Sequence, residues 1–189
     1  MKKLMIAAAM VCAAAMVQAG SVQWGAIGVV SSGTAYVGGT TTYSAYLFEG
    51  SDITDATSLL TGGKFKDFTD LAKQSNTATA TTAATPKMNF SNKNYGSFSQ
   101  GDSFTGYMVI LDAAEAKDAK NYLLATWAGT GADQGKSVIT KTQGASGNLM
   151  FSYGNQASNT AWTSIAPEPT SGLLLLIGMA GLALRRRRA

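Results

Sequence analysis

"SFTGYMVIL", residues 103–111, carries apolar side chains on both of its alternating faces. Successive side chains of a strand point to opposite faces, so a half-buried strand alternates between apolar and polar residues. A strand without a polar face is typical of the buried part of a sheet. The segment therefore predicts a buried central strand, and the rest of the fold is expected to be built around it.

Four other segments have the composition of strands. They are residues 21–30 (SVQWGAIGVV), 41–48 (TTYSAYLF), 122–127 (YLLATW) and 147–153 (GNLMFSY), which are rich in β-branched and aromatic residues. Two of them alternate clearly, with Gln23 opposite the apolar face of the first. The residues expected to face the core are Val22, Trp24, Ala26, Leu149, Phe151 and Tyr153.

Two short helices are also expected. Asp112 is placed to cap a helix over residues 113–120, with Glu115 three residues later as its capping-box partner. Phe65, Phe68 and the pair at 71–72 lie near helical spacing after two glycines, and ordinary core packing accounts for these apolar residues.

Residues 75–87 (SNTATATTAATPK) have low complexity and little apolar area to bury, so they predict a mobile surface loop. Taken together, the segments predict one exported domain over residues 20–166. Its fold class is mostly β and sandwich-like, with one or two short helices that would make it α+β.

The N-terminal residues 1–19 have the three parts of a secretory signal peptide. Two lysines follow Met1, an apolar run covers residues 4–17, and the compact residues Val17 and Ala19 flank Gln18. The run is shorter than the roughly 20 apolar residues of a membrane-spanning helix. We expect signal peptidase to cleave between Ala19 and Gly20.

The basic net charge of the whole chain comes from its two terminal segments. The chain has 15 basic and 11 acidic residues, but six of the basic ones lie within the two terminal segments. The remaining nine are all lysines and are outnumbered by the acidic residues, so the basic balance is no argument for nucleic-acid binding. The single cysteine, Cys12, belongs to the predicted signal peptide, and the mature fold is therefore expected to rest on its core without disulfides.

The composition excludes several common classes of catalytic site. The chain has no histidine, which removes the Ser-His-Asp triad and His-containing zinc motifs. Residues 129–137 (GTGADQGKS) resemble a phosphate-binding loop, but Thr130 stands where that loop needs glycine. We expect no enzyme, no catalytic residue, no cofactor and no metal site.

Two weaker alternatives remain open. Asp52/Asp55, Asp67/Asp70 and Glu115/Asp118 are acidic pairs that we interpret as solvated charges and helix caps, although a glycosidase also needs two carboxylates. Trp24, Trp127 and Trp162 are interpreted as core residues, and the alternative is a sugar-stacking face of a secreted carbohydrate-binding module.

The C-terminal segment 167–189 has three parts. Pro167 and Pro169 hold Glu168 in an extended segment that lacks two backbone donors. Residues 172–184 are apolar and would form a helix of about 20 Å, which is short against a hydrocarbon core of roughly 30 Å. Four arginines follow and would stay on the cytoplasmic side: Arg185, Arg186, Arg187 and Arg188.

This order of proline-bracketed glutamate, short apolar helix and terminal arginines, together with a signal peptide, resembles the PEP-CTERM sorting signal of bacterial exported proteins. The resemblance implies that an exosortase-type membrane transpeptidase recognises Pro167, Glu168 and Pro169 and cuts near them. It further implies that residues 172–184 are a transient membrane helix and that Arg185 to Arg188 retain it. The destination would be the cell surface or the extracellular matrix, where extracellular polysaccharide is a partner. The open alternative is a permanent C-terminal membrane anchor, and the resemblance supplies no activity for residues 20–166.

Overall fold

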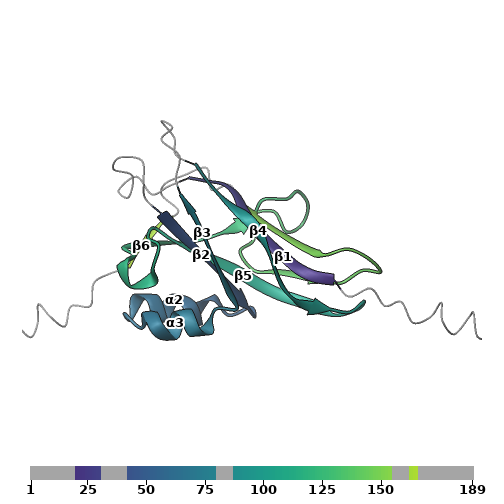
Figure 1. Cartoon of the computed structure of the whole chain (residues 1–189), viewed down its shortest axis with the longest axis horizontal. Coiled ribbons are helices and arrows are strands. Elements are labelled where there is room, and N and C mark those ends of the chain that lie inside the picture. The colour runs from purple at the N-terminus through teal and green to yellow at the C-terminus, as the bar shows by residue number, and fades with distance from the viewer. Residues whose placement is uncertain (1–19, 31–41, 80–86, 155–161, 166–189) are drawn as a thin grey trace, which may run out of the picture.

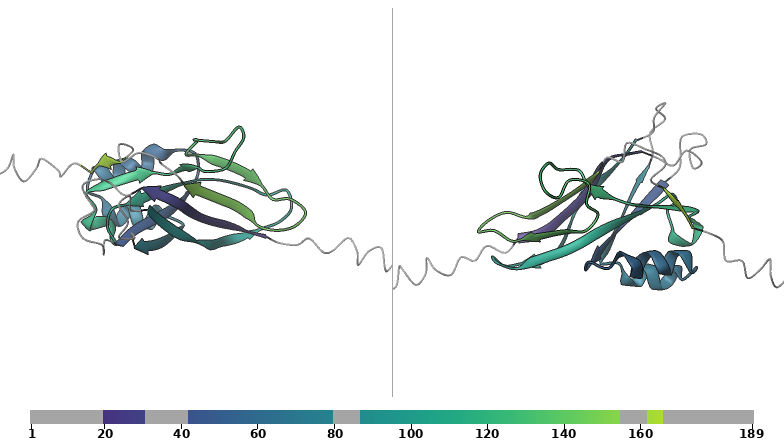
Figure 2. Two further views of the ribbon diagram at one scale, coloured as in Figure 1. Left: turned by 90° about the horizontal axis from the view of Figure 1, so that it is seen from above. Right: turned by 180° about the vertical axis from the view of Figure 1, so that it is seen from behind.

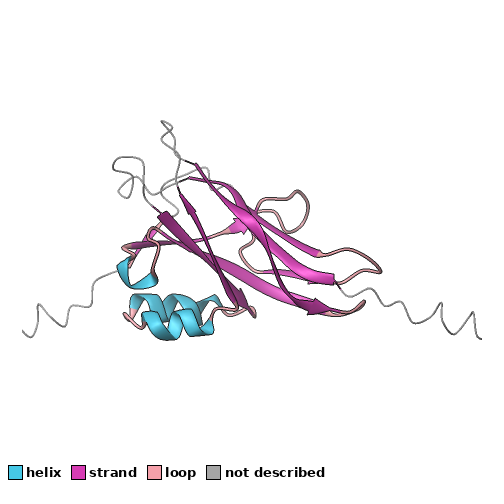
Figure 3. Cartoon of the chain, in the orientation of Figure 1, coloured by secondary structure: helices cyan, strands magenta, loops and turns pink. Residues whose placement is uncertain are grey.

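The computed structural model describes residues 20–30, 42–79, 87–154 and 162–165 (Figure 1). Within these ranges the chain is mostly β, with two short α-helices and one 3-10 turn (Figure 3). The predicted signal peptide at 1–19 and the whole predicted sorting segment at 167–189 lie outside the described residues. No helix within the described ranges is long and apolar enough to cross a membrane.

The strands form two sheets. The first has the order β4-β1-β9-β7 and contains β1 (Gly20–Val30), β4 (Lys87–Phe98), β7 (Thr126–Trp127) and β9 (Leu149–Gly154). The second has the order β10-β6-β5-β2-β3, with β8 also paired to β5. Its members are β2 (Thr42–Glu49), β3 (Gln74–Thr79), β5 (Ser103–Leu111), β6 (Asn121–Leu124), β8 (Ile139–Thr142) and β10 (Thr163–Ser164). All pairs are antiparallel except β1 with β9, which is parallel.

The helices α2 (Ile53–Thr61) and α3 (Phe65–Leu71) cover the face of the second sheet that points away from the first (Figures 1 and 2). One core lies between the two sheets, and a second lies between the second sheet and the helices. The prediction for residues 103–111 is confirmed, since β5 has these bounds and pairs with β2, β6 and β8. Phe104, Met108 and Ile110 enter the first core, whereas Val109 and Leu111 enter the second.

The alternation predicted for the two flanking strands of the first sheet is also confirmed. Val22, Trp24 and Ala26 of β1 and the three inward residues of β9 are buried in the first core. Met150, between two of the β9 core residues, is 45% exposed. The segment 122–127 is a more complex case, because it forms β6 and β7 in different sheets. The buried Ala125 marks the crossing, and its N–H donates to the carbonyl of Met108 at 2.9 Å.

The helix prediction at 113–120 is wrong, because only the 3-10 turn η1 (Ala116–Asp118) forms there. The Asp112 carboxylate does not cap a helix. It accepts hydrogen bonds from the backbone N–H groups of Lys120 and Asn121 at 2.8 and 2.9 Å, and from Asn121 Nδ2 at 2.7 Å. These hydrogen bonds close residues 112–121 into a loop between β5 and β6. The same carboxylate is then not available to cap a helix that begins at residue 113.

The helix prediction at 65–72 is confirmed by α3, whose buried residue is Phe68. The preceding helix α2 is an additional element. Asp52 is its N-cap, with Oδ1 accepting from the N–H of Thr54 at 2.9 Å, and Asp55 lies in its first turn. One member of the acidic pair Asp52/Asp55 is thus a helix cap, as expected.

The loop predicted at 75–87 is wrong for residues 75–79, which belong to β3, and Lys87 already opens β4; residues 80–86 lie outside the described ranges. Strand β3 pairs with β2, and its side chains bond across to β4. Gln74 Nε2 donates to the carbonyl of Asn94 at 3.0 Å, and Asn76 Nδ2 donates to that of Ser91 at 2.6 Å. Hydrogen bonds from polar side chains thus stabilise β3, although this strand has little apolar area to bury. Composition alone does not indicate these hydrogen bonds.

Candidate functional site

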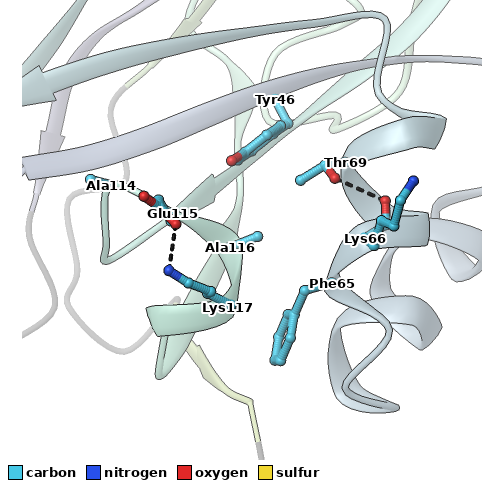
Figure 4. A pocket seen from close by; sticks show the side chains of 8 residues that line it. All are labelled: Tyr46, Phe65, Lys66, Thr69, Ala114, Glu115, Ala116 and Lys117. Carbon is cyan, nitrogen blue, oxygen red and sulfur yellow. Dashed lines mark hydrogen bonds and ion pairs between the residues drawn. The ribbon is translucent and has the colours of Figure 1, made fainter.

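A groove of about 450 Å³ lies between α3 and η1, with β2 behind it (Figure 4). Tyr46, Phe65 and two alanines give it an apolar lining, and charged side chains stand on both sides. The lining residues are Tyr46, Phe65, Lys66, Thr69, Ala114, Glu115, Ala116 and Lys117. The turn η1, which stands where the sequence predicted a helix, forms one wall of the groove with Ala116 and Lys117.

The charges beside the groove are paired with one another. Lys66 forms an i,i+4 ion pair with Asp70, and Lys117 Nζ lies 2.6 Å from Glu115 Oε2 and 3.5 Å from Asp118 Oδ2. The hydrogen bond to Asp70 raises the pKa of Lys66, and the hydrogen bond to Glu115 raises that of Lys117. The bond from Lys117 in turn lowers the pKa of Glu115. Both lysines and Glu115 are therefore charged at neutral pH, and their charges stabilise one another across exposed ion pairs.

The acidic pairs serve local structure where the structure shows their partners. Asp52 caps α2, Asp70 pairs with Lys66, and Glu115 and Asp118 share Lys117. Within the described ranges, no group of three or more His, Cys, Asp or Glu side chains is arranged to hold a metal ion. Four of the six carboxylates are thus engaged in solvated ion pairs or a helix cap, which was the interpretation favoured by the sequence.

The three tryptophans do not form a fully exposed face. Trp24 is buried at the centre of the first core, and its Nε1 donates to Gln74 Oε1. Trp127 and Trp162 are half-buried against the same core. Lys141 Nζ lies 3.9 Å from the ring centroid of Trp127 and makes a cation–π contact with one face of the ring. Core packing, the preferred interpretation, describes all three residues.

The first and last buried residues of the described domain are close in sequence to the predicted processing positions. Gly20, the residue after the predicted cleavage, is buried as the first residue of β1. At the other end Ile165 is buried in the second core, and its N–H donates to the carbonyl of Lys120 at 2.8 Å. The start of β1 and strand β10 lie at opposite ends of the domain (Figures 1 and 2).

Ala19, the motif Pro167 to Pro169, the apolar run 172–184 and Arg185 to Arg188 all lie outside the described residues. The residue that sequence reasoning missed is Gln143, which is 3% exposed next to Gly20. A polar residue in a glycine-rich segment carries no pattern that would reveal its burial. Compared with protein-family models, curated proteins and solved structures, the chain matches none of them.

Proposed function

We propose that this chain is an exported, non-enzymatic surface or matrix protein that is sorted through its C-terminal segment. The observation that carries the proposal is the order of parts in residues 167–189: an extended Pro-Glu-Pro tripeptide, a short apolar run and four terminal arginines. In this proposal Pro167, Glu168 and Pro169 are recognised by an exosortase-type transpeptidase. Residues 172–184 hold the chain in the membrane until it is processed.

The length of the apolar run supports temporary rather than permanent retention. A helix of this length spans about 20 Å, so the bilayer must thin or the arginines must snorkel to complete the crossing. Each adjustment costs free energy, and the hold on the membrane is weaker than that of a full-length span. A permanent anchor is the competing proposal for the same residues.

The extent of the described domain is compatible with this division of the chain. Its first element begins at Gly20 and its last buried residue is Ile165, so the globular part lies between the two predicted processing sites. Only one residue, Ala166, separates Pro167 from the buried Ile165. The processing enzyme would therefore have to work close to the folded domain.

The test is the C-terminal mass of the chain isolated from the organism that makes it. The wild-type chain should end near residue 169, whereas a variant with Pro167, Glu168 and Pro169 all replaced by alanine should keep its full C-terminus and stay in the membrane fraction. Pro86→Ala is the matched control, because it removes the one proline outside the motif, and it should be processed as the wild type. An intact C-terminus in the wild type would establish permanent anchoring instead.

A further inference from the structure

The predicted sorting motif has few main-chain donors of its own. Among Pro167, Glu168 and Pro169, only Glu168 has a backbone N–H, because proline has none. An extended peptide is commonly bound as an added strand, through main-chain hydrogen bonds. The donors that the motif lacks then come from the residues on either side of it, and the nearest upstream are those of Ala166 and Ile165.

Ile165 is already engaged by the folded domain. Its N–H donates to the carbonyl of Lys120 at 2.8 Å, and its side chain is only 7% exposed in the second core. The same N–H cannot bind the Lys120 carbonyl and an enzyme at once. Recognition that extends upstream of Pro167 therefore requires Ile165 to leave its place in the domain.

The length of the chain between Ile165 and the motif leads to the same requirement. Three extended residues span about 10–11 Å, so the Cα atom of Glu168 is no farther than this from the Cα atom of Ile165. Two packed protein layers lie about 10 Å apart. One wall of a cleft that encloses Glu168 thus takes up nearly all of this length, and the enzyme would meet the domain surface while Ile165 is in place.

Strand β10 is held by few contacts at the edge of the second sheet (Figure 2). It has two residues, both exposed, and within the described ranges it pairs with β6 alone. The opposite side of this contact is fixed, because the Asp112 carboxylate accepts from the N–H groups of Lys120 and Asn121. A short edge strand of this kind can open while the rest of the domain stays folded, and the burial of Ile165 opposes the opening.

We propose that the recognition site of the processing enzyme includes Ile165 and Ala166, and that release of β10 uncovers it. The inference rests on the proposed function, because it needs an enzyme that acts at residues 167–169. Trp162 keeps its contact with Tyr43, where the ring centroids lie 6.0 Å apart, so the released segment begins at residue 163. When opening and closing are fast relative to cleavage, the fraction of molecules with β10 open sets the rate of processing.

The first test follows processing in the organism that makes the chain. Newly made chain is pulse-labelled, and the loss of the C-terminal segment is followed by mass. Ile165→Ala weakens the hold on β10 and should shorten the half-time of processing at least about tenfold, because the apolar contacts of a buried isoleucine are lost. Ile139→Ala is the matched control, since Ile139 is 1% exposed in the first core, and it should change the half-time by less than about threefold.

A disulfide between β10 and β6 makes the opposite change. Ser164 pairs with Asn121, next to the hydrogen-bonded pair of Ile165 and Lys120. Non-hydrogen-bonded pairs of this kind have Cα atoms about 4.5 Å apart, which a disulfide can bridge. Ser164→Cys combined with Asn121→Cys should lengthen the half-time at least about tenfold, whereas each single substitution should leave it near that of the wild type.

These outcomes separate the two proposals. An intact C-terminus in the wild type would overturn both. A processed wild type with an unchanged half-time in Ile165→Ala, or in the chain with both cysteines, would overturn this inference alone. Equal acceleration by Ile165→Ala and Ile139→Ala would also overturn it, because processing would then follow unfolding of the whole domain.

Hydrogen exchange measures the opening of β10 without the enzyme. In the purified full-length chain, in detergent micelles, the amide of Ile165 should exchange at least about tenfold faster than that of Val109 in the central strand β5. Equal exchange of the two amides would show that β10 opens only when the whole domain unfolds, and would overturn the inference.

Discussion

Replacing Phe68 by alanine should separate the helical layer from the second sheet. Phe68 is the buried residue of α3, and its ring centroid lies 5.0 Å from that of Tyr46 and 5.1 Å from that of Phe48. Removing a fully buried phenylalanine costs about 3–5 kcal/mol, because the apolar transfer free energy is lost and a cavity remains. Since a domain of this size unfolds with about 5–15 kcal/mol, the variant should lose a large part of its stability.

The matched control is Phe65→Ala in the same helix. Phe65 is only half-buried beside the groove, so its loss should cost about 1–2 kcal/mol. Both variants are measured by urea unfolding, with far-ultraviolet circular dichroism for the helices and tryptophan fluorescence for the first core. Equal losses for the two variants, or a loss below about 1.5 kcal/mol for Phe68→Ala, would refute the view that the helical layer is fastened through this ring.

Three further predictions concern single polar groups. Burial, together with nearby aspartate charges, raises the pKa of Tyr107 from 10.0 to about 12. The stability that the neutral phenol contributes is therefore complete below pH 10 and lost as the pH rises toward 12. Urea unfolding at a series of pH values should show a decline that Tyr107→Phe makes smaller, and the rest of the decline comes from Tyr153, whose pKa is also raised by burial. Tyr153→Phe removes the 2.9 Å hydrogen bond to the Gly106 carbonyl between the sheets and should cost about 1 kcal/mol in chemical unfolding. Asp112→Ala should lower the free energy of unfolding by about 2 kcal/mol, because three donors lose a charged acceptor, whereas exposed Asp118→Ala should change it by less than about 0.5 kcal/mol.

Strand identity followed from local pattern where the pattern was strong. Residues 103–111 lack a polar face, and β5 is covered on one side by the first sheet and on the other by the helices. The alternation at Val22, Trp24 and Ala26 likewise indicated which face of β1 enters the core. A period of two residues is a property of any strand, so it can be recognised without knowing the neighbours.

The failed predictions are those in which distant groups compete with local preference. Asp112 had the spacing of a helix cap, yet its carboxylate binds Lys120 and Asn121 across a loop. The Thr-rich segment after Gln74 had little apolar area, yet side-chain hydrogen bonds to β4 hold its first residues in a strand. Such partners lie 8 to 20 residues apart in sequence, so the periodicity of neighbouring residues does not identify them.

The sequence by itself determined which faces of β1, β5 and β9 are apolar, the lack of histidine chemistry and the order of parts in residues 1–19 and 167–189, on which the proposed export and sorting depend. The tertiary structure alone decided the parallel pairing of β1 with β9, the groove beside η1 and the burial of Gln143 against Gly20. The physical reason is the range of the interactions. Hydrophobic periodicity and proline geometry act between neighbours in the chain, whereas the surroundings of Gly20 are formed by a loop more than 120 residues away.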